Sequence, residues 1–328
     1  MKIGTRSSTM ALAQTNEIVA QLRAAIPGLQ PAVVHFKPRG DVDQTSKLDR
    51  HGGKGGAFVA EIREAMRNGT LDAAMHSLKD VPGDEEAPGL VFAAYLKREA
   101  VEDALVLHPD LSLETLEARG GEGLKLGTNS VRRAAFLSEL YPQAEIIHYR
   151  GAADTRIAKL DARQLQNLPG GGQVGPADAL VMAKSGLGRV GLADRIVKTY
   201  PPTQMLPAVG QGIVVVECAA RDWKTREMLA LIDDADARMA AMAEREMLWI
   251  LNGHCNAPIA GLAMRNGDQL TLRAAVLSLD GKTIIRGERT GPAEKPRELG
   301  RSVGLSLLAE GADALIAGSA PDGTLGAV

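Results

Sequence analysis

Two segments of this chain share one short pattern, and that repetition limits the folds open to it. Residues 2–7 (Lys-Ile-Gly-Thr-Arg-Ser) and residues 125–130 (Lys-Leu-Gly-Thr-Asn-Ser) both follow K-[IL]-G-T-x-S. In each copy a short apolar strand runs into a serine-containing turn, and a helical pattern follows. A chance match over six positions is the alternative. The pattern favours a duplicated structure with two α/β lobes that face each other across a cleft.

Arginines recur at the strand-to-helix turns of both halves. A helix start attracts anions through its free N–H groups and its dipole, and Ser7 or Ser8 can cap the first helix. A guanidinium adds a fork for a carboxylate. A single arginine is more often a solvated surface charge, but the repetition predicts a cleft for an elongated ligand with several carboxylates or phosphates. The arginines at these turns are Arg6, Arg132, Arg133, Arg150 and Arg156.

The segment 72–82 (Asp-Ala-Ala-Met-His-Ser-Leu-Lys-Asp-Val-Pro) gathers polar groups at the end of an apolar strand. Pro82 stops regular structure because it lacks a backbone donor. In open α/β sheets, ligands bind outside the carboxyl ends of the strands. Asp80 is therefore the candidate catalytic residue. The alternative is a solvated turn in which Lys79 and Asp80 form a surface pair.

Composition excludes several classes of function. A net charge of −2 and a pI near 6.3 give no global footprint for nucleic acid or an anionic membrane. Aromatic residues make up only 3%, which argues against stacking platforms for single strands. The amino terminus lacks the apolar core of a signal peptide, and no run of about 18 apolar residues occurs, so we expect a cytoplasmic protein. The two cysteines, Cys218 and Cys255, cannot form a four-thiolate metal site, and we expect no metal.

The remaining pattern predicts a third, smaller unit. Residues 206–217 read as a glycine turn and a strand that returns to the first lobe. A helical section is predicted from Thr225 to Leu251, followed by an antiparallel meander over 258–289 and a covering helix over 299–308. The glycine-rich segment 52–56 reads as a loop that carries a cation, with a plain surface linker as the alternative. Residues 169–172 read as a loose loop.

Six motifs in the same order resemble the hydroxymethylbilane synthase family, also called porphobilinogen deaminase. They span almost the whole chain, and each is weak to moderate alone. The motifs are T-R-S-S-x-M-A-L-A-Q at 5–14, G-G-K-G at 52–55, H-S-L-K-D-V-P at 76–82, G-T-N-S-V-R-R at 127–133, L-P-A-V-G-Q-G at 206–212 and G-H-C-N-A-P at 253–258.

The resemblance implies an α/β fold with two periplasmic-binding-protein-like lobes and a small α+β C-terminal domain. Lobe 1 would comprise residues 1–99 and 203–222, lobe 2 residues 100–202, and the C-terminal domain residues 223–328. The implied activity condenses four porphobilinogen molecules head-to-tail, with loss of ammonia, onto a covalent dipyrromethane cofactor and releases hydroxymethylbilane by hydrolysis. The cofactor would be joined by a thioether to Cys255. We also expect a monomer.

The resemblance also assigns roles to individual residues. Asp80 would stabilise the cation formed as ammonia leaves and assist proton transfer. The residues implied to hold the cofactor are Ser77, Lys79, Asp80, Thr128, Ser130, Arg132, Arg133 and Cys255. Those implied to hold substrate or the growing chain are Arg6, Ser8, Arg150, Arg156 and Arg189. For Cys255 the alternative is an inert buried thiol, which is also our expectation for Cys218.

Several departures from the family pattern stand out. The family usually has Arg-Gly-Asn after the strand at 146–149, whereas this chain has Arg150-Gly151-Ala152, and Glu102 stands where a basic residue is common. The glycine loops after Lys54 and at 169–175 are longer than usual.

A noncatalytic two-lobe binding protein for an acidic small molecule is the main alternative, but it would not need Asp80 in a cleft built for anions. A phosphate-handling transferase is less favoured because the chain lacks a P-loop.

Overall fold

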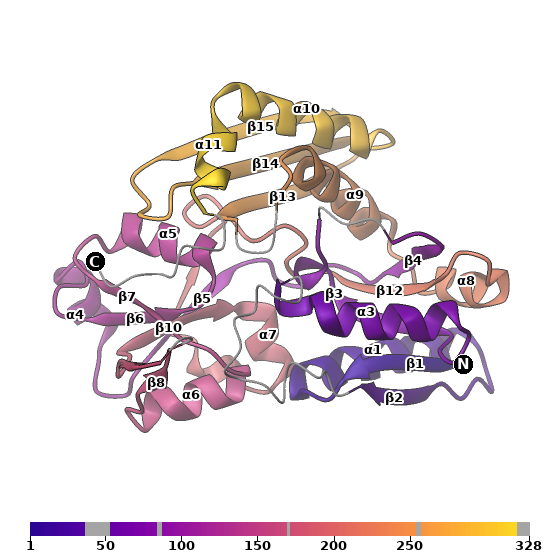
Figure 1. The fold of residues 1–328 in the computed structure, drawn as a ribbon, viewed down its shortest axis with the longest axis horizontal. Helices are drawn as coiled ribbons and strands as arrows, with labels where there is room; N and C mark the ends of the chain where they lie inside the picture. The colour runs from indigo at the N-terminus through magenta and orange to yellow at the C-terminus, as the bar shows by residue number, and fades with distance from the viewer. Residues whose placement is uncertain (37–52, 84–86, 169–170, 254–256, 320–328) are drawn as a thin grey trace.

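A computed structural model describes residues 1–36, 53–83, 87–168, 171–253 and 257–319, with the side chains of residues 53–58 left aside. Two sheet-containing lobes lie side by side, and a third domain lies above both of them in Figure 1. In the described ranges, every helix is too short or too polar to span a lipid bilayer.

Lobe 1 is built on a five-stranded sheet of order β2-β1-β3-β12-β4. Strands β1, β2 and β3 are parallel, whereas β12 pairs antiparallel with both β3 and β4. The strands are β1 (Lys2–Arg6), β2 (Ala32–Phe36), β3 (Ala73–Ser77), β4 (Leu90–Tyr95) and β12 (Val214–Ala219). The helices are α1 (Thr9–Ala25), α3 (Gly53–Arg67), the short turn η2 (Leu78–Asp80) and α8 (Trp223–Ala230).

Lobe 2 is built on a second five-stranded sheet, of order β11-β5-β10-β6-β7. Its strands are β5 (Asp103–Leu107), β6 (Lys125–Thr128), β7 (Glu145–His148), β10 (Ala179–Ala183) and β11 (Lys198–Tyr200). Its helices are α4 (Leu113–Ala118), α5 (Val131–Leu140), α6 (Ala153–Asp161), α7 (Lys184–Arg189) and η3 (Ala193–Arg195). A two-stranded hairpin joins β8 (Gln166–Asn167) to β9 (Gln173–Val174).

The two sheets have equivalent strand orders, which supports the duplication. Strand β1 lies between parallel β2 and β3, and β6 lies in the same way between parallel β7 and β10. In each sheet an antiparallel strand follows, β12 or β5, and then an edge strand. The repeated K-[IL]-G-T pattern therefore occupies the same place in both sheets, and the fold class expected from the sequence is confirmed.

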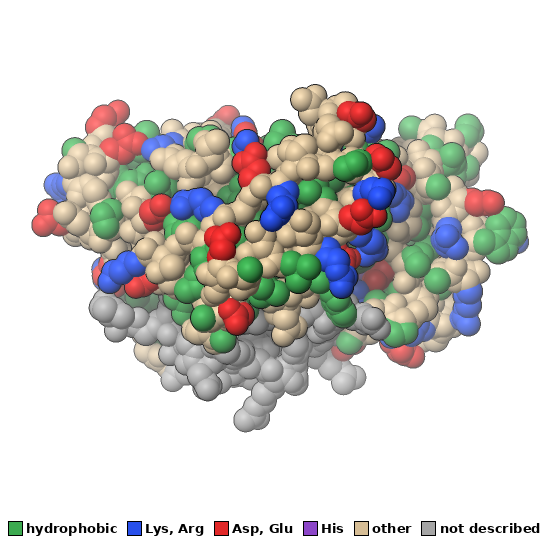
Figure 2. All heavy atoms as spheres, turned by 90° about the horizontal axis from the view of Figure 1, so that it is seen from above, with side chains coloured by type: hydrophobic (Ala, Val, Ile, Leu, Met, Phe, Trp, Pro, Cys, Tyr) green, Lys and Arg blue, Asp and Glu red, His purple; other side chains and the backbone are tan. Residues whose placement is uncertain are grey.

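The C-terminal domain packs three helices of the described part against an antiparallel meander. The meander of β13 (Ile259–Asn266), β14 (Gln269–Leu277) and β15 (Ile284–Pro292) is confirmed, with bounds that differ by a few residues from the expected ones. Its helices are α9 (Ala235–Ile250), α10 (Pro296–Ala309) and α11 (Ala312–Ala317). The face of this domain seen from above carries interspersed basic and acidic side chains, as Figure 2 shows. No continuous basic patch is visible among the described residues of that face.

The C-terminal domain is fastened to the two segments that cross between the lobes, residues 96–102 and 201–213. Arg98 of the first crossover forms an ion pair with Glu244 of α9 and donates to the carbonyl of Gln211 in the second. The Glu244 carboxylate, fully buried, also accepts from the N–H groups of Gly210 and Ala263. Both crossovers are thus held against one helix.

Two local expectations were wrong. The helix expected from Thr225 to Leu251 is two helices, because Asp234 caps α9 by accepting from the N–H of Ala237 and so ends the preceding segment. Residues 53–56 begin helix α3 instead of remaining in a loop. The expected loop at 169–172 agrees with the structure for residues 171–172, which precede β9 and belong to no helix or strand, and residues 169–170 lie outside the described part.

Candidate active site

The polar turns of both lobes lie at the carboxyl ends of parallel strands, as expected. In lobe 1, Arg6 ends β1 and the Lys79-Asp80 turn follows β3. In lobe 2, Ser130 follows β6 and Arg150 follows β7. Ser8 caps α1 by accepting from the N–H of Ala11, and Ser130 caps α5 in the same way from Arg133. These serines orient the first turns of the helices that border the cleft.

The Lys79-Asp80 turn is held in place by the second crossover and by helix α9. Leu78 is buried, and its N–H donates to the carbonyl of Ile213. Arg245 of α9 donates to the carbonyl groups of Val81 and Pro82, at 3.3 and 2.9 Å. Lys79 and Asp80 themselves are exposed, and within the described part of the chain the Asp80 carboxylate makes no hydrogen bond or ion pair. The fold therefore leaves this carboxylate available to a ligand.

A small cavity of about 90 Å³ lies where all three domains meet. Lobe 1 contributes Lys79, lobe 2 contributes Ser130 and Arg132, and the C-terminal domain contributes Gly253 and other residues. The complete lining is Leu78, Lys79, Val81, Gly83, Ser130, Val131, Arg132, Ala208, Val209, Arg245, Leu248, Gly253, Ala257 and Ile259. Cys255 lies outside the described residues, but the residues on either side of its segment, Gly253 and Ala257, both line this cavity.

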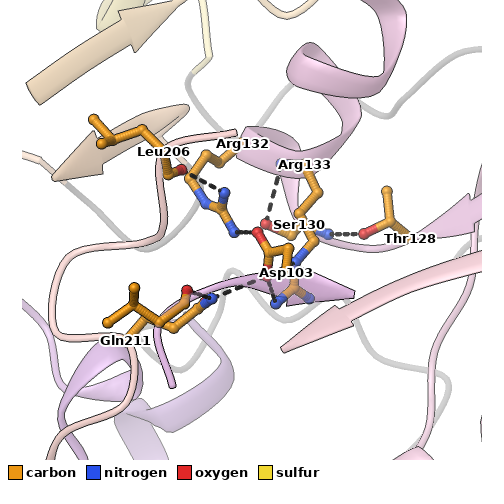
Figure 3. A network of polar contacts seen from close by, with 8 residues as sticks. Asp103, Thr128, Ser130, Arg132, Arg133, Leu206 and Gln211 are labelled. Carbon is orange, nitrogen blue, oxygen red and sulfur yellow. Dashed lines mark hydrogen bonds and ion pairs between the residues drawn. The ribbon is translucent and has the colours of Figure 1, made fainter. Parts of the chain in front are cut away.

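One buried carboxylate organises the arginine pair of lobe 2 (Figure 3). Asp103 accepts from Arg132 Nη2 at 2.6 Å and from Arg133 Nε and Nη2 at 3.0 and 2.8 Å. Gln211 Nε2 of the second crossover donates to the same carboxylate at 2.9 Å. Arg132 also donates to the carbonyl of Leu206. The two guanidinium groups are therefore fixed, and part of their donor capacity is already used.

The electrostatics of the site favour an anion. Lys79 is reached by solvent but surrounded by protein, and this partial desolvation, followed by the nearby Arg133, lowers the pKa of its ammonium group from 10.5 to about 8. Burial opposes ionisation of Asp103, but Arg132 and Arg133 outweigh it and hold the pKa of this carboxyl well below its usual value. Arg132 Nε is buried and has no acceptor in the described ranges. Cations thus outnumber the acids here, which suits a ligand with several carboxylates.

The lobe 2 turn after β7 carries a second cationic group. Burial lowers the pKa of Arg150, and burial followed by Arg133 lowers that of Arg156 to about 10. Neither guanidinium has an acidic partner among the described residues. The charge of Arg133 thus repels that of Arg156, and no acidic side chain of the described residues pairs with Arg156. Such an arrangement is expected of a site that binds an anion.

The other expected site residues lie nearby with partners of their own. Ser77 donates to Gln14, and Thr128 is buried and accepts from the N–H of Ser130. Arg189 forms an ion pair with Glu17 of α1 at 3.4 Å, so it bridges the two lobes. The role of each in binding stays a prediction. Cys218 is fully buried in β12, and burial raises the pKa of its thiol to about 11, as expected of an inert cysteine.

Sequence reasoning missed Asp103, Gln211 and Arg245. Asp103 begins a strand and gave no motif of its own, and Gln211 stood inside the L-P-A-V-G-Q-G motif without an assigned role. Arg245 lies within a helix, and its partners, the carbonyl groups of Val81 and Pro82, are 164 and 163 residues away. A buried aspartate beside two arginines cannot be identified from one sequence because the contact spans about 30 residues.

Other candidate sites are less suitable. An open groove of about 300 Å³ lies between β15 and α10, lined partly by Arg289, Lys295 and Glu298, but it lies in the C-terminal domain alone and contains none of the expected site residues. The described part of the chain contains no group of three or more side chains that could hold a metal ion.

Comparisons with known proteins give a consistent result. A family model described as "Porphobilinogen deaminase, dipyromethane cofactor binding domain" matches residues 1–227, and one described as "Porphobilinogen deaminase, C-terminal domain" matches residues 239–309. A porphobilinogen deaminase of Roseiflexus castenholzii is 41% identical over 97% of this chain and 99% of its own length. Porphobilinogen deaminase 2 of Streptomyces coelicolor is 40% identical over 98% and 97%.

Solved structures give only distant matches. The periplasmic VFT2 domain of BvgS from Bordetella pertussis has a TM-score of 0.39 and 14% identity, with 70% of this chain and 86% of that chain covered. A sulfonate-binding protein SsuA from Methylobacillus flagellatus has a TM-score of 0.37 and 13% identity, with 76% and 68% covered. At these TM-scores the likeness supports no conclusion, and the strand orders alone define the fold.

Proposed function

Because this chain belongs to the porphobilinogen deaminase family, we propose that its three-domain cavity is the active site of that reaction. The enzyme condenses four porphobilinogen molecules head-to-tail, with release of ammonia, onto a dipyrromethane cofactor and releases hydroxymethylbilane by hydrolysis. The observation that carries the assignment is the convergence of Lys79, Arg132 and Gly253 from three domains on one cavity beside Asp80. A noncatalytic binding protein is not supported by full-length relatives that are named as enzymes.

The residues around the cavity fit a cofactor that bears several carboxylates. Lys79, Arg132 and Arg133 supply positive charge, Thr128 and Ser130 supply hydroxyl groups, and Ser77 lies at the strand end beside them. Cys255 supplies the thioether from the segment between Gly253 and Ala257, since a thiolate is the strongest common side-chain nucleophile. When bound, the dipyrromethane supplies the free pyrrole carbon to which the first substrate ring is joined.

Asp80 is the catalytic residue in this proposal. Loss of ammonia from the aminomethyl group of porphobilinogen leaves a cation delocalised over the pyrrole, and a nearby carboxylate stabilises it. The new carbon–carbon bond forms when a pyrrole carbon attacks this cation, and a proton then leaves that carbon. The Asp80 carboxylate is exposed and unpaired in the described part of the chain, so it can contact pyrrole N–H groups and assist that proton transfer.

The remaining cations bind the acetate and propionate groups of the substrate and the growing chain. Arg150 and Arg156 present guanidinium groups without acidic partners in the described ranges. Arg6 and Ser8 stand opposite, at the end of β1 and the start of α1, and Arg189 joins them if its ion pair with Glu17 opens. Bidentate guanidinium forks suit a row of carboxylates.

The proposal extends to the assembly and the location. Porphobilinogen is the small-molecule partner, with no nucleic acid or membrane, and we propose a cytoplasmic monomer. Its domains follow the boundaries expected from the sequence, except that α8 packs with lobe 1 through Leu229. Multi-angle light scattering of the purified chain tests the monomer, because a dimer would have twice the 34.6 kDa mass.

The intact mass of the denatured protein tests the cofactor assignment. We expect an excess that matches two linked pyrroles in the purified chain, and its loss in Cys255→Ser. Cys218→Ser is the matched control, because that thiol is fully buried in β12 and should leave the excess unchanged. A bare chain mass that stays unchanged after incubation with porphobilinogen would refute the assignment.

Turnover of Asp80→Asn tests the catalytic assignment. The amide keeps the shape of the side chain and removes its charge, so we expect a fall in kcat of at least about 100-fold, the size seen when one electrostatic stabiliser is removed. The cofactor mass should remain. Normal turnover in this variant would show that Asp80 is only a surface carboxylate.

A further inference from the structure

The turn that opens α6 lacks the side chain that normally secures a helix start. Ala152 occupies the N-cap position with φ −64° and ψ 162°, and it makes no side-chain hydrogen bond because it has no polar atom. The cap of α1 is Ser8 and that of α5 is Ser130, and both accept from the first turn. The α6 start therefore has no N-cap acceptor at 152, and within its first turn the Asp154 carboxylate accepts from the N–H of Thr155 at 2.7 Å.

A residue from outside the turn binds the backbone just before this helix start. Gln166, in strand β8, is 3% exposed, and its Oε1 accepts from the N–H of Arg150 at 3.3 Å. Because a backbone N–H can only donate, this contact fixes which end of the amide faces Arg150. The Nε2 group on the other end is buried and has no acceptor in the described part of the chain. The buried Gln166 amide therefore leaves its Nε2 donor unsatisfied, which is unfavourable, and its Oε1 makes the hydrogen bond to Arg150.

The β8–β9 hairpin places Gln166 at this position. Gln166 pairs with Val174, and Asn167 pairs with Gln173. At the base of the hairpin, Arg163 forms an ion pair with Asp178 at 2.8 Å, and Asp178 in turn accepts from the N–H of Lys125 at the start of β6. The hairpin is therefore tied to the central sheet of lobe 2 independently of α6.

Arg150 and Arg156 stand on the segment that Gln166 holds. Arg150 is the residue whose N–H is bound, and Arg156 follows within the first turn and a half of α6, its own N–H donating to the carbonyl of Ala152. A displacement of the 150–152 backbone would therefore move both guanidinium groups. We propose that Gln166 is a positioning residue that sets the place of Arg150 and Arg156 in the cleft, an inference that rests on their proposed role in binding substrate carboxylates.

Steady-state kinetics of Gln166→Met with porphobilinogen test the proposal. Methionine keeps the length and bulk of the side chain but removes the acceptor. We expect KM to rise about 2- to 10-fold, the range for one neutral hydrogen bond, with kcat within twofold of the unaltered enzyme. Gln173→Met is the matched control, because it makes the same change in the same hairpin at an exposed side chain that donates to Asn167 of that hairpin. It should leave KM unchanged.

The conservative variant Gln166→Glu provides the decisive comparison. Its side chain keeps the length of glutamine and an oxygen acceptor for the N–H of Arg150, so KM should stay within twofold of the unaltered enzyme. A purely structural role for Gln166 would lower thermal stability and the active fraction without a rise in KM that is specific to Gln166→Met. An unchanged KM in Gln166→Met, or an equal rise in KM in both variants, would overturn the proposal.

Amide hydrogen exchange separates this inference from the proposed function. We expect faster exchange across 149–156 in Gln166→Met than in Gln173→Met, whether or not the protein turns over porphobilinogen. Faster exchange in a protein without turnover would leave the positioning contact standing and refute the proposed function. Unchanged exchange at Arg150 would refute the positioning contact itself.

Discussion

Asp103→Asn should lower the stability of the protein more than the same substitution at any other aspartate of lobe 2. The carboxylate is fully buried and accepts four hydrogen bonds, three from Arg132 and Arg133 and one from Gln211. The amide would leave two buried guanidinium groups with no counter-ion and would turn one N–H₂ toward them. Removal of one partner from a buried ion pair costs about 3–5 kcal/mol. With an unfolding entropy of about 2.1 cal/mol/K per residue, that corresponds for this 328-residue chain to a fall in Tm of roughly 4–7 °C.

Differential scanning calorimetry of the cofactor-free protein measures this effect, with Asp161→Asn as the control. Asp161 also forms an ion pair with an arginine of lobe 2, Arg195, but both side chains are about a third exposed. An exposed pair contributes about 0–1 kcal/mol, so Asp161→Asn should shift Tm by no more than about 1–2 °C. Equal shifts in the two variants would refute the view that Asp103 neutralises the arginine pair.

The pH dependence of the same comparison follows from the depressed pKa of Asp103. A carboxyl whose native pKa lies below the ordinary 3.8 contributes stability that is present above 3.8 and is lost as pH falls through the native pKa. The difference in stability between the unaltered protein and Asp103→Asn should therefore stay constant between pH 5 and 8. It should narrow only below about pH 4. A difference that narrows already at pH 6 would show that another group is responsible.

Two further outcomes are expected. The pKa of Lys79 is lowered to about 8, so the ammonium group loses its charge as pH rises through that value. Loading of the cofactor onto cofactor-free protein, followed by intact mass, should therefore slow above pH 8 in the unaltered chain. In Lys79→Met the loading rate should depend less on pH. Gly212→Ala should lower stability by about 1–3 kcal/mol in a denaturant titration, because φ is +86° and a Cβ would lie 2.6 Å from the carbonyl oxygen of Glu99; an unchanged midpoint would mean that the crossovers can separate.

Local patterns predicted much of the fold. The strand-to-helix turns, the meander and the returning strand β12 are short-range features, because strand ends, caps and Asn-Gly or Asp-Gly turns are written in adjacent residues. The repeated K-[IL]-G-T pattern even indicated the equivalence of β1 and β6. The division between α8 and α9 was missed because the periodicity of apolar residues continues through it, and only the capping contact of Asp234 ends the run.

The sequence predicted the basic residues of the site but not the residues that hold them in position. Arginines beside serine caps form recognisable motifs, whereas Asp103 carries no local signal and acquires its role from helix α5. Gln166 lies just before the glycine-rich loop at 169–175, and its contact with Arg150 depends on how the hairpin folds back. Positioning residues of this kind are set by tertiary contacts, which a single sequence does not reveal.

The placement of β12 has a consequence for how the chain is made. The sheet of lobe 1 is interrupted until β12 inserts between β3 and β4, and β12 begins 119 residues after β4 ends (214 − 95). The sheet of lobe 2 comes entirely from residues 103–200. At about 5–20 residues per second, ribosomal synthesis completes the strands of lobe 2 before β12 emerges. The sheet of lobe 1 is therefore completed after the sheet of lobe 2, although lobe 1 begins the sequence. Until β12 is synthesised, the edges of β3 and β4 that will pair with it stay unpaired.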